Sequence, residues 1–311
     1  MIWLFIALFV AVVFIVTGGY VFFTACLRKK ELPWLVKEEI EKTAYGKYYG
    51  MILQSSKWLS EQGATDVFIQ SDDGLRLHGL WIPADEPKGT VLFAHGYRST
   101  YLVDFGMAME FYHEKGMNLL IPDQRSHGKS EGRYITFGVK ESRDMARWID
   151  FHNESLGNCP ILLSGLSMGA STMLYLADQD LPDNVKGIIA DCGFTSPKAI
   201  IGSVFTAVTH LPAFLCMWVT DLFARLFAGF SIYGKDTVQT LCNSRIPVFM
   251  IHGTDDGFVP CEMTKAGFEA CTGTKKLLLV EGADHGVSFV VDRETYTNMI
   301  NQFIGETLGN P

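Results

Sequence analysis

The motif Gly165-Leu166-Ser167-Met168-Gly169 lies between a short apolar run at 160–164 and a helix-compatible run at 170–178. Small residues two positions before and after a serine let the neighbouring backbone pass close to a sharp turn between a strand and a helix. The serine hydroxyl is then exposed at the helix N-terminus, where the helix dipole favours developing negative charge. The motif therefore predicts a strand, a tight turn and a helix, with Ser167 as a nucleophile.

Seven further short runs, rich in β-branched residues or leucine, lie on either side of this motif, at 66–71, 75–83, 90–94, 117–121, 185–190, 246–251 and 275–280. The first two flank Asp72-Asp73-Gly74, a turn signal, so we expect them to form a hairpin. Longer stretches separate the other runs. Strands that alternate with helices predict an α/β fold with a mainly parallel sheet covered on both faces. In such a sheet, functional residues gather at the carboxyl ends of the strands.

The composition is that of a folded, acidic protein. Of the 311 residues, 48% are hydrophobic and 19% are charged, and the formal net charge is −8. The only basic run is Arg28-Lys29-Lys30, which argues against a nucleic-acid partner because phosphate binding needs clustered Lys and Arg. The seven cysteines show no C-x-x-C spacing, so we expect neither a disulfide framework nor a metal site.

The N-terminal segment carries no charged residue between Ile2 and Leu27. As a helix it would be about 39 Å long, against a hydrocarbon core of about 30 Å. We therefore expect one uncleaved transmembrane anchor at 1–30, and the positive-inside rule applied to Arg28-Lys29-Lys30 places the remainder in the cytoplasm. A cleaved signal peptide would need a basic start and a shorter apolar core. Phe23-Thr24-Ala25-Cys26 is similar to a lipoprotein cleavage box, but phenylalanine is unusual at its first position.

Two further segments have a distinct character. Residues 31–62 mix acidic and apolar side chains, which predicts a juxtamembrane helical segment leading into a domain at 63–311.

Within that domain, 200–233 is apolar and aromatic-rich, with two charged residues, Asp221 and Arg225. A second membrane span is one interpretation of this stretch. Because Pro212 interrupts it and it lies between two core strands, we favour a helical cap at about 195–243 over the active site. A cap this apolar would offer an apolar pocket.

Partners for Ser167 follow two later strands. A hydroxyl is a poor nucleophile until a base takes its proton, and the expected chain order is nucleophile, acid, histidine. After the run 246–251, a loop contains Asp255 and Asp256. We favour Asp256 as the acid and keep Asp255 as the alternative; an Asp-Asp-Gly sequence can also simply close a turn. After the run 275–280, His285 lies in a loop of small residues, and it is the histidine with the right order and position for the base.

An oxyanion needs two donors aimed at it. We expect one from the backbone N–H of Met168, directly after the nucleophile, and one from the backbone N–H of Tyr97, in the loop after the run 90–94. His95, in the same loop, is interpreted as a brace.

The residues 122–130 contain Asp123, Arg125 and His127. Such a cluster could suggest a metal or phosphate site. We interpret it instead as a hydrogen-bonded loop that braces the turn at Ser167.

Five segments together resemble the α/β-hydrolases: His95-Gly96, 123–130, 165–169, 252–260 and Asp284-His285. More narrowly, they are similar to the single-domain branch related to serine aminopeptidases and prolyl-oligopeptidase-like esterases, some of which carry an N-terminal membrane anchor. The likeness extends over about 58–303. It implies an eight-stranded core sheet, no cofactor, and a triad of Ser167, Asp256 and His285. The cap is the variable part of this family and decides the substrate.

The leading hypothesis is a serine hydrolase that cleaves carboxylic esters or thioesters through an acyl-enzyme on Ser167. The apolar cap and the anchor favour small-molecule or lipid-like ester substrates delivered from the membrane. A serine peptidase is the alternative, but it needs a site for a peptide amine, often acidic residues in the cap. A non-catalytic, membrane-tethered binding protein is the third hypothesis, and such proteins usually lack a member of the triad. The sequence leaves the oligomeric state open.

Overall fold

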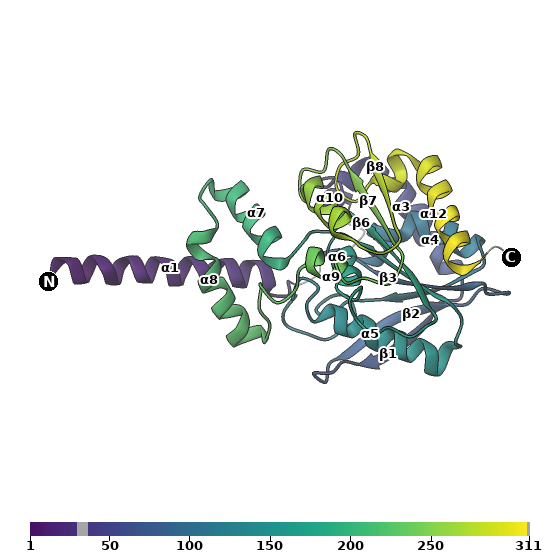
Figure 1. Cartoon of the computed structure of the whole chain (residues 1–311), viewed down its shortest axis with the longest axis horizontal. Coiled ribbons are helices and arrows are strands. Elements are labelled where there is room, and N and C mark those ends of the chain that lie inside the picture. Colours follow the sequence, from purple (N-terminus) through teal and green to yellow (C-terminus); the bar gives the residue numbers. More distant parts are fainter. Residues whose placement is uncertain (30–36, 310–311) are drawn as a thin grey trace.

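Helix α1 (Ile2–Cys26) projects from one end of the structure with α7 (Pro197–Thr209) and α8 (Phe214–Phe223) beside it, and most of the other elements gather around a β-sheet (Figure 1). The computed structural model describes residues 1–29 and 37–309. Lys30 and residues 31–36, which belong to the predicted anchor and juxtamembrane segment, lie outside the described residues. The strands are β1 (Thr65–Gln70), β2 (Arg76–Ile82), β3 (Gly89–Ala94), β4 (Met117–Pro122), β5 (Ile161–Leu166), β6 (Val185–Asp191), β7 (Val248–Gly253) and β8 (Lys275–Val280).

Helices fill most of the intervals between these strands. They are α2 (Lys37–Ile40), α3 (Tyr49–Glu61), α4 (Tyr101–Glu114), α5 (Glu141–Phe151), α6 (Met168–Leu174), α7 (Pro197–Thr209), α8 (Phe214–Phe223), α9 (Thr237–Leu241), α10 (Cys261–Ala270), α11 (Ser288–Val291) and α12 (Arg293–Leu308). Three shorter turns have other helical geometries: the 3₁₀ turn η1 (Ala44–Tyr48) and the π turns η2 (His152–Leu156) and η3 (Ala224–Ala228).

The strands form one sheet in the order β1-β2-β4-β3-β5-β6-β7-β8. The pairs β1–β2 and β2–β4 are antiparallel, and every later pair is parallel. Within the described residues, this confirms the predicted eight-stranded, mainly parallel sheet, with strand ends that differ by at most two residues from those expected. Asp72-Asp73-Gly74 closes the predicted hairpin, with Gly74 at φ +85°, a backbone conformation that favours glycine.

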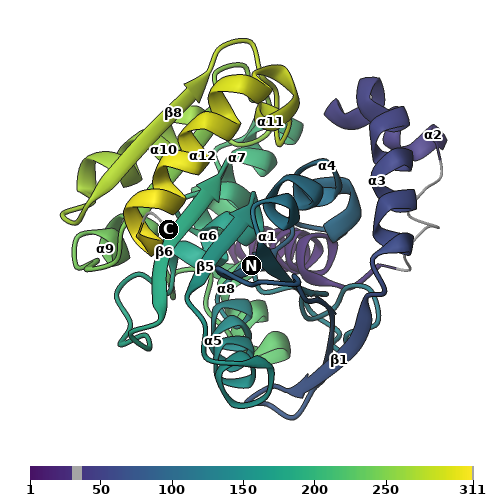
Figure 2. The ribbon, with the colours of Figure 1, turned by 90° about the vertical axis from the view of Figure 1, so that its right-hand side faces the viewer.

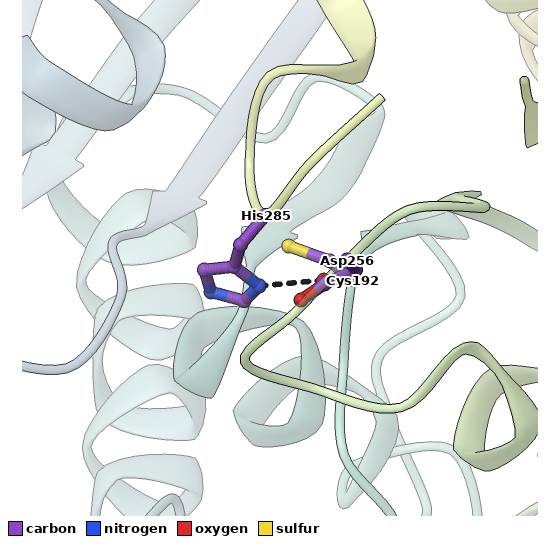
Figure 3. A group of neighbouring side chains, drawn as sticks. All are labelled: Cys192, Asp256 and His285. Atoms are coloured by element: carbon purple, nitrogen blue, oxygen red, sulfur yellow. Dashed lines mark hydrogen bonds and ion pairs between the residues drawn. The ribbon is translucent and has the colours of Figure 1, made fainter. Parts of the chain in front are cut away.

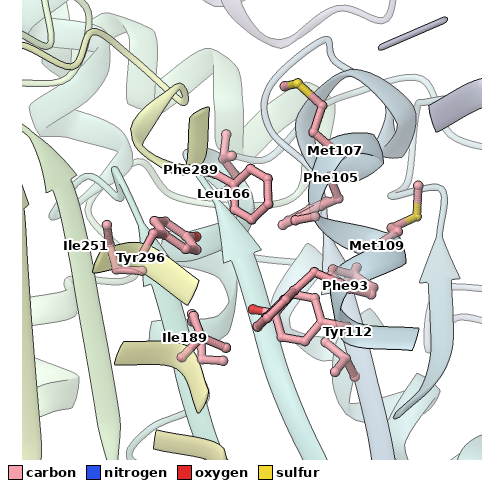
Figure 4. Packing of buried hydrophobic residues seen from close by; sticks show 14 of the residues in the cluster. Phe93, Phe105, Met107, Met109, Tyr112, Leu166, Ile189, Ile251, Phe289 and Tyr296 are labelled. Carbon is pink, nitrogen blue, oxygen red and sulfur yellow. The ribbon is translucent and has the colours of Figure 1, made fainter. Parts of the chain in front are cut away.

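The central strands β3, β4, β5 and β7 are buried on both faces. Alternate residues of a strand point to opposite faces, and each face lies under an apolar core. On β3, Val91 and Phe93 belong to one apolar core, while Leu92 and Ala94 belong to another. The first core contains side chains of α3, α4, α11 and α12, and Figure 4 shows Phe93 packed among residues of this core. The second core contains side chains of α5, α6 and α9. Helix α3, in the predicted juxtamembrane segment, packs along α4 (Figure 2).

The predicted cap is helical, but it lies beside α1 (Figure 1). A Cβ added at Gly18 would be 2.5 Å from the Cβ of Val219 in α8, so the two helices are in close contact. The hydroxyl of Thr220 donates to the carbonyl oxygen of Gly18 at 3.3 Å. Helix α8 and η3, where the ring of Phe227 lies 5.4 Å from that of Phe23, therefore pack against the C-terminal half of α1.

Candidate active site

Ser167 occupies a strained turn between β5 and α6. Its backbone has φ +56° and ψ −117°, in the region that non-glycine residues rarely adopt. A conformation of this kind costs about 1–3 kcal/mol and persists only where the surrounding structure imposes it. The Ser167 N–H donates to the carbonyl oxygen of Asp191 at the end of β6, at 2.8 Å, which ties the turn to the next strand.

The two glycines of the motif are required by close backbone contacts. A Cβ added at Gly165 would lie 2.3 Å from the carbonyl oxygen of Gly169. A Cβ added at Gly169 would lie 1.7 Å from the carbonyl oxygen of Ala94 at the end of β3. No side chain fits at such distances, so α6 can approach β3 and β5 only with glycine at these positions. The strand, turn and helix predicted around Ser167 are all present.

The structure brings the three predicted triad residues together. The Ser167 hydroxyl lies 2.9 Å from Nε2 of His285, and Nδ1 of His285 lies 2.7 Å from Oδ2 of Asp256. An imidazole with its proton on Nδ1 donates to the carboxylate and leaves Nε2 free to accept the serine proton. The ring of Phe258 packs edge-on against His285, with centroids 5.1 Å apart. The arrangement can move a proton from the hydroxyl to the imidazole.

The geometry also distinguishes between the two aspartates after β7. Asp256 faces His285, whereas Asp255 is exposed and accepts from the hydroxyl of Thr254 at 3.0 Å. Oδ1 of Asp256 accepts the N–H groups of Phe258 and Val259, at 2.9 and 2.8 Å.

A second histidine, His252, lies 3.1 Å from Oδ2 of Asp256. Burial opposes the charged form of Asp256, but hydrogen bonds from His252 and His285 outweigh it and hold the pKa of Asp256 well below its usual range. Asp256 is therefore a carboxylate that can stabilise an imidazolium. His252 was not singled out as a site residue from the sequence, because its contact with Asp256 depends on the fold of the 254–259 loop.

Both residues predicted to donate to the oxyanion lie near Ser167. Met168 is the first residue of α6, and the first N–H groups of a helix have no partner within it. Tyr97 lines the same cavity as Ser167, and its neighbour Gly96 lies so close that an added Cβ would be 3.3 Å from the Cβ of Ser167. The roles of Met168 and Tyr97 as oxyanion donors remain predictions.

Asp104, which the sequence analysis did not single out, organises the loop that carries Tyr97. Its Oδ2 accepts the N–H of Gly96 at 2.5 Å, and its Oδ1 accepts the hydroxyl of Ser99 at 2.6 Å. Tyr45 of η1 adds a third donor to Oδ1, at 3.3 Å. Burial raises the pKa of Asp104, and the bonds from Ser99 and Gly96 offset part of that effect. In the sequence, Asp104 could have been noticed as an acidic residue within the mainly apolar run 101–112. No sequence feature pointed to Tyr45.

The residues 123–130 are hydrogen-bonded to neighbouring segments of the domain. The side chain of Gln124 donates to the carbonyl oxygen of His95, and its N–H donates to Nε2 of His95 at 3.0 Å. Nε2 of His127 accepts the N–H of Arg98 at 3.0 Å. Arg125 donates twice to Asp144, at 2.6 Å each. These contacts connect the loop to the segment 95–98, in agreement with the interpretation of His95 and this cluster as braces.

A cavity of about 700 Å³ opens beside Ser167 and His285. The juxtamembrane segment contributes much of its wall, through Glu39, Ile40, Lys42, Thr43, Ala44 and Tyr45. Among the described residues that line this cavity, none belongs to 195–243. Helix α8 of this stretch packs on α1, and Ile200, Ile201, Cys216 and Met217 share an apolar core with Met168 beside the nucleophile. The role of 195–243 as a cap over the active site stays a prediction.

Cys192, Asp256 and His285 form a compact group whose ligand atoms lie within 4.8 Å of one another (Figure 3). A metal would need the thiolate of Cys192, but burial raises the pKa of this thiol well above its usual value. The Asp256 carboxylate and the His285 ring are also already bonded to each other. The group is better described as a hydrogen-bonded pair beside a neutral thiol than as a metal centre.

Comparisons with known proteins agree with this fold. A family model described as serine aminopeptidase, S33, matches residues 85–228. Protein YqkD of Bacillus subtilis (strain 168), described as uncharacterized, is 26% identical over 241 residues, which cover 77% of this chain and 79% of YqkD. Among solved structures, the Pyrococcus furiosus esterase Pf2001 is 26% identical with a TM-score of 0.65, and the match covers 81% of this chain and 94% of the esterase.

The sheet topology, the strained serine turn and these matches have one common explanation: the chain belongs to the α/β-hydrolase superfamily. Within that superfamily, its sequence is similar to the serine aminopeptidase model and to the archaeal esterase.

The contacts of Asp104 lead to a testable prediction. Asp104→Asn leaves one acceptor oxygen where the structure uses two, so the loop 96–99 should lose its position. We expect kcat/KM for a p-nitrophenyl ester to fall by about 10–100-fold, the range typical of a displaced catalytic group. Tyr45→Phe removes one hydrogen-bond donor to Asp104 and should lower kcat/KM by about tenfold or less. Wild-type rates for a folded Asp104→Asn variant would contradict this account of the loop.

Proposed function

We propose that this protein is a serine hydrolase that cleaves carboxylic ester or thioester bonds through an acyl-enzyme on Ser167. The observation that carries the proposal is the chain of hydrogen bonds from Ser167 through His285 to Asp256, at 2.9 and 2.7 Å. Three residues far apart in the sequence meet in the order and geometry of a nucleophile, a base and an acid that orients it.

The proposed reaction proceeds in two halves. As the Ser167 oxygen attacks the carbonyl carbon, Nε2 of His285 takes the hydroxyl proton and Asp256 stabilises the resulting imidazolium. The N–H groups of Met168 and Tyr97 donate to the oxyanion that forms. His285 returns its proton to the departing alcohol or thiol, which leaves an acyl group on Ser167. Water then attacks this acyl group, His285 takes the water proton, and the carboxylic acid leaves as Ser167 regains its hydrogen.

The position of α1 supports a lipid-like or acylated substrate. Among the described residues, α1 is the one helix that is both long enough and apolar enough to cross a membrane. Its C-terminal end meets the loop beside the cavity: the Tyr97 hydroxyl donates to the carbonyl oxygen of Ala25 at 2.7 Å, and Arg98 donates to that of Thr24 at 2.7 Å. An ester held in a bilayer around α1 would thus be close to Ser167. A single-pass membrane protein with a cytoplasmic catalytic domain remains part of the proposal.

A peptidase is the alternative that the serine aminopeptidase match favours. An aminopeptidase would need a carboxylate free to bind a substrate amine. The cavity is lined by Glu39, Asp104 and Asp284. Glu39 is bonded to Lys42 at 2.6 Å, and Asp104 accepts three protein donors. Oδ1 of Asp284 accepts the N–H groups of Gly257 and His285. Each of the three carboxylates already accepts at least one protein donor, and Asp104 uses both of its oxygens, which favours an ester over a peptide amine in this cavity.

Labelling with a fluorophosphonate probe tests whether Ser167 is activated. We expect the folded wild type to be labelled and Ser167→Ala to remain unlabelled, because the probe reacts with a serine whose proton a base removes. Heat-denatured wild type is the control for non-specific reaction. A folded wild type that resists the probe would instead favour a non-catalytic, membrane-tethered binding protein.

Replacement of the neighbouring aspartates, one at a time, tests the role of Asp256. Asp256→Asn should lower kcat by about 10⁴-fold, because an amide no longer holds the imidazole in the productive tautomer. Asp255→Asn is the matched control, and as a surface change it should alter the rate by about twofold or less. Steady-state kinetics on one ester substrate measure both. Equal losses in the two variants would remove the basis for assigning the acid to Asp256.

A series of substrates tests the proposed specificity. With p-nitrophenyl esters of increasing acyl length, kcat/KM should rise, because each buried methylene contributes about 0.8 kcal/mol and so about fourfold. Aminoacyl p-nitroanilides should react poorly by comparison. Rates that are independent of acyl length would contradict a lipid-like substrate, and efficient turnover of the anilides would establish the peptidase.

A further inference from the structure

The segment α7–η3 exposes large apolar side chains that have no role in the cavity. The exposed residues are Val208, Leu211, Phe214, Trp218, Leu222, Leu226 and Phe227. Phe214 is 74% exposed and Trp218 is 59% exposed. Apolar patches of this kind mark an interaction site for protein or lipid.

This apolar face adjoins α1. A Cβ added at Gly18 would lie 2.5 Å from the side chain of Val219, and one added at Gly19 would lie 3.0 Å from the ring of Phe223. The two glycines therefore let α8 approach α1 closely. Further along, the ring of Phe227 lies 5.4 Å from that of Phe23. The contact therefore continues from Gly18 toward the C-terminal end of α1.

The length of α1 fixes the depth of this contact. A hydrocarbon core of about 30 Å accommodates about 20 helical residues, and α1 has 25. Any stretch of about 20 residues within Ile2–Cys26 contains both Gly18 and Gly19, wherever it begins. If α1 crosses a bilayer, the side chains of Val219 and Phe223 that touch these glycines lie at the depth of the lipid chains.

The segment has three charged residues: Lys198, in the first turn of α7 with its ammonium 5.1 Å from the ring centroid of Tyr233, and the pair Asp221 and Arg225. Arg225 and Asp221 form an ion pair at 2.7 Å, and Oδ1 of Asp221 also accepts the hydroxyl of Ser231 and the N–H of Ile232. Charged groups inside a membrane are paired in this way. Arg225 lies in η3, the part of the segment that is close to the C-terminal end of α1. From this position its long side chain can extend to the lipid headgroups.

We propose that α7, α8 and η3 are embedded in one leaflet of the membrane beside α1, with their exposed apolar side chains in contact with lipid acyl chains. The segment is too short for a second span, since α7 has 13 residues and α8 has 10, about 20 and 15 Å of helix. Lipid is the occupant because the face is continuous with the exposed surface of α1. This inference depends on the membrane location of α1 in the proposed function, and is independent of the catalytic chemistry.

Tryptophan quenching tests the proposal on the full-length protein. The chain is reconstituted in vesicles of dioleoylphosphatidylcholine, with or without bromine on the acyl chains, and wild type is compared with Trp218→Phe. The fluorescence difference reports Trp218 alone. Trp3→Phe gives the corresponding signal for α1, and Trp81→Phe gives it for β2, where Trp81 packs against His152 within the domain. We expect brominated lipid to quench Trp218 and Trp3 to a comparable extent and to leave Trp81 unchanged.

The outcomes are distinct. Quenching of Trp3 without quenching of Trp218 would overturn the proposal while α1 remains in the bilayer. If neither is quenched, α1 does not span, and this proposal is overturned together with the membrane location. A Trp218 signal that bromine does not affect, but that shifts with protein concentration, would show that a second copy covers the face. Fluorophosphonate labelling is read separately, so a labelled protein with unquenched Trp218 would retain its hydrolase function and lose only this inference.

Discussion

The active-site geometry depends on one close contact, the approach of Gly169 to the carbonyl oxygen of Ala94. Because an added Cβ would lie 1.7 Å from that oxygen, glycine alone lets α6 begin directly against β3. This packing forces Ser167 into its positive-φ turn and presents its hydroxyl to His285. The conformational strain at Ser167 is balanced by burial of the surrounding turn in the sheet.

The rest of the site is held by electrostatics among buried groups. Asp256 stays charged because two histidines and two backbone N–H groups surround it, and Asp104 uses both of its oxygens to hold the loop of Gly96. Through Tyr45, this second carboxylate also connects the juxtamembrane segment to the active site.

The helix α1 does more than extend from the domain. Its C-terminal end accepts hydrogen bonds from Tyr97 and Arg98 beside the cavity, and its glycines receive α8. Helix α1, the loop beside the cavity and the helices α8 and η3 are thus in direct contact with one another. For a hydrolase of lipid-like esters, these contacts would hold the cavity at a constant distance from the bilayer.

Local pattern in the sequence determined the strands, the turn at Ser167 and the candidates Asp256 and His285, because strand periodicity, glycine spacing and chain order are properties of neighbouring residues. The choice between Asp255 and Asp256 needed the loop geometry, since a shift of one residue moves a carboxylate from His285 to the surface. The place of 195–243 was also decided by tertiary structure: the apolar pattern predicts burial of some surface, and only the fold shows that α8 packs on α1 and that Ile200 and Met217 share a core with Met168. The roles of Tyr45 and Asp104 were likewise decided by tertiary structure. Tyr45 bonds a residue far away in the chain, and the contacts of Asp104 depend on how the loop at Gly96 folds.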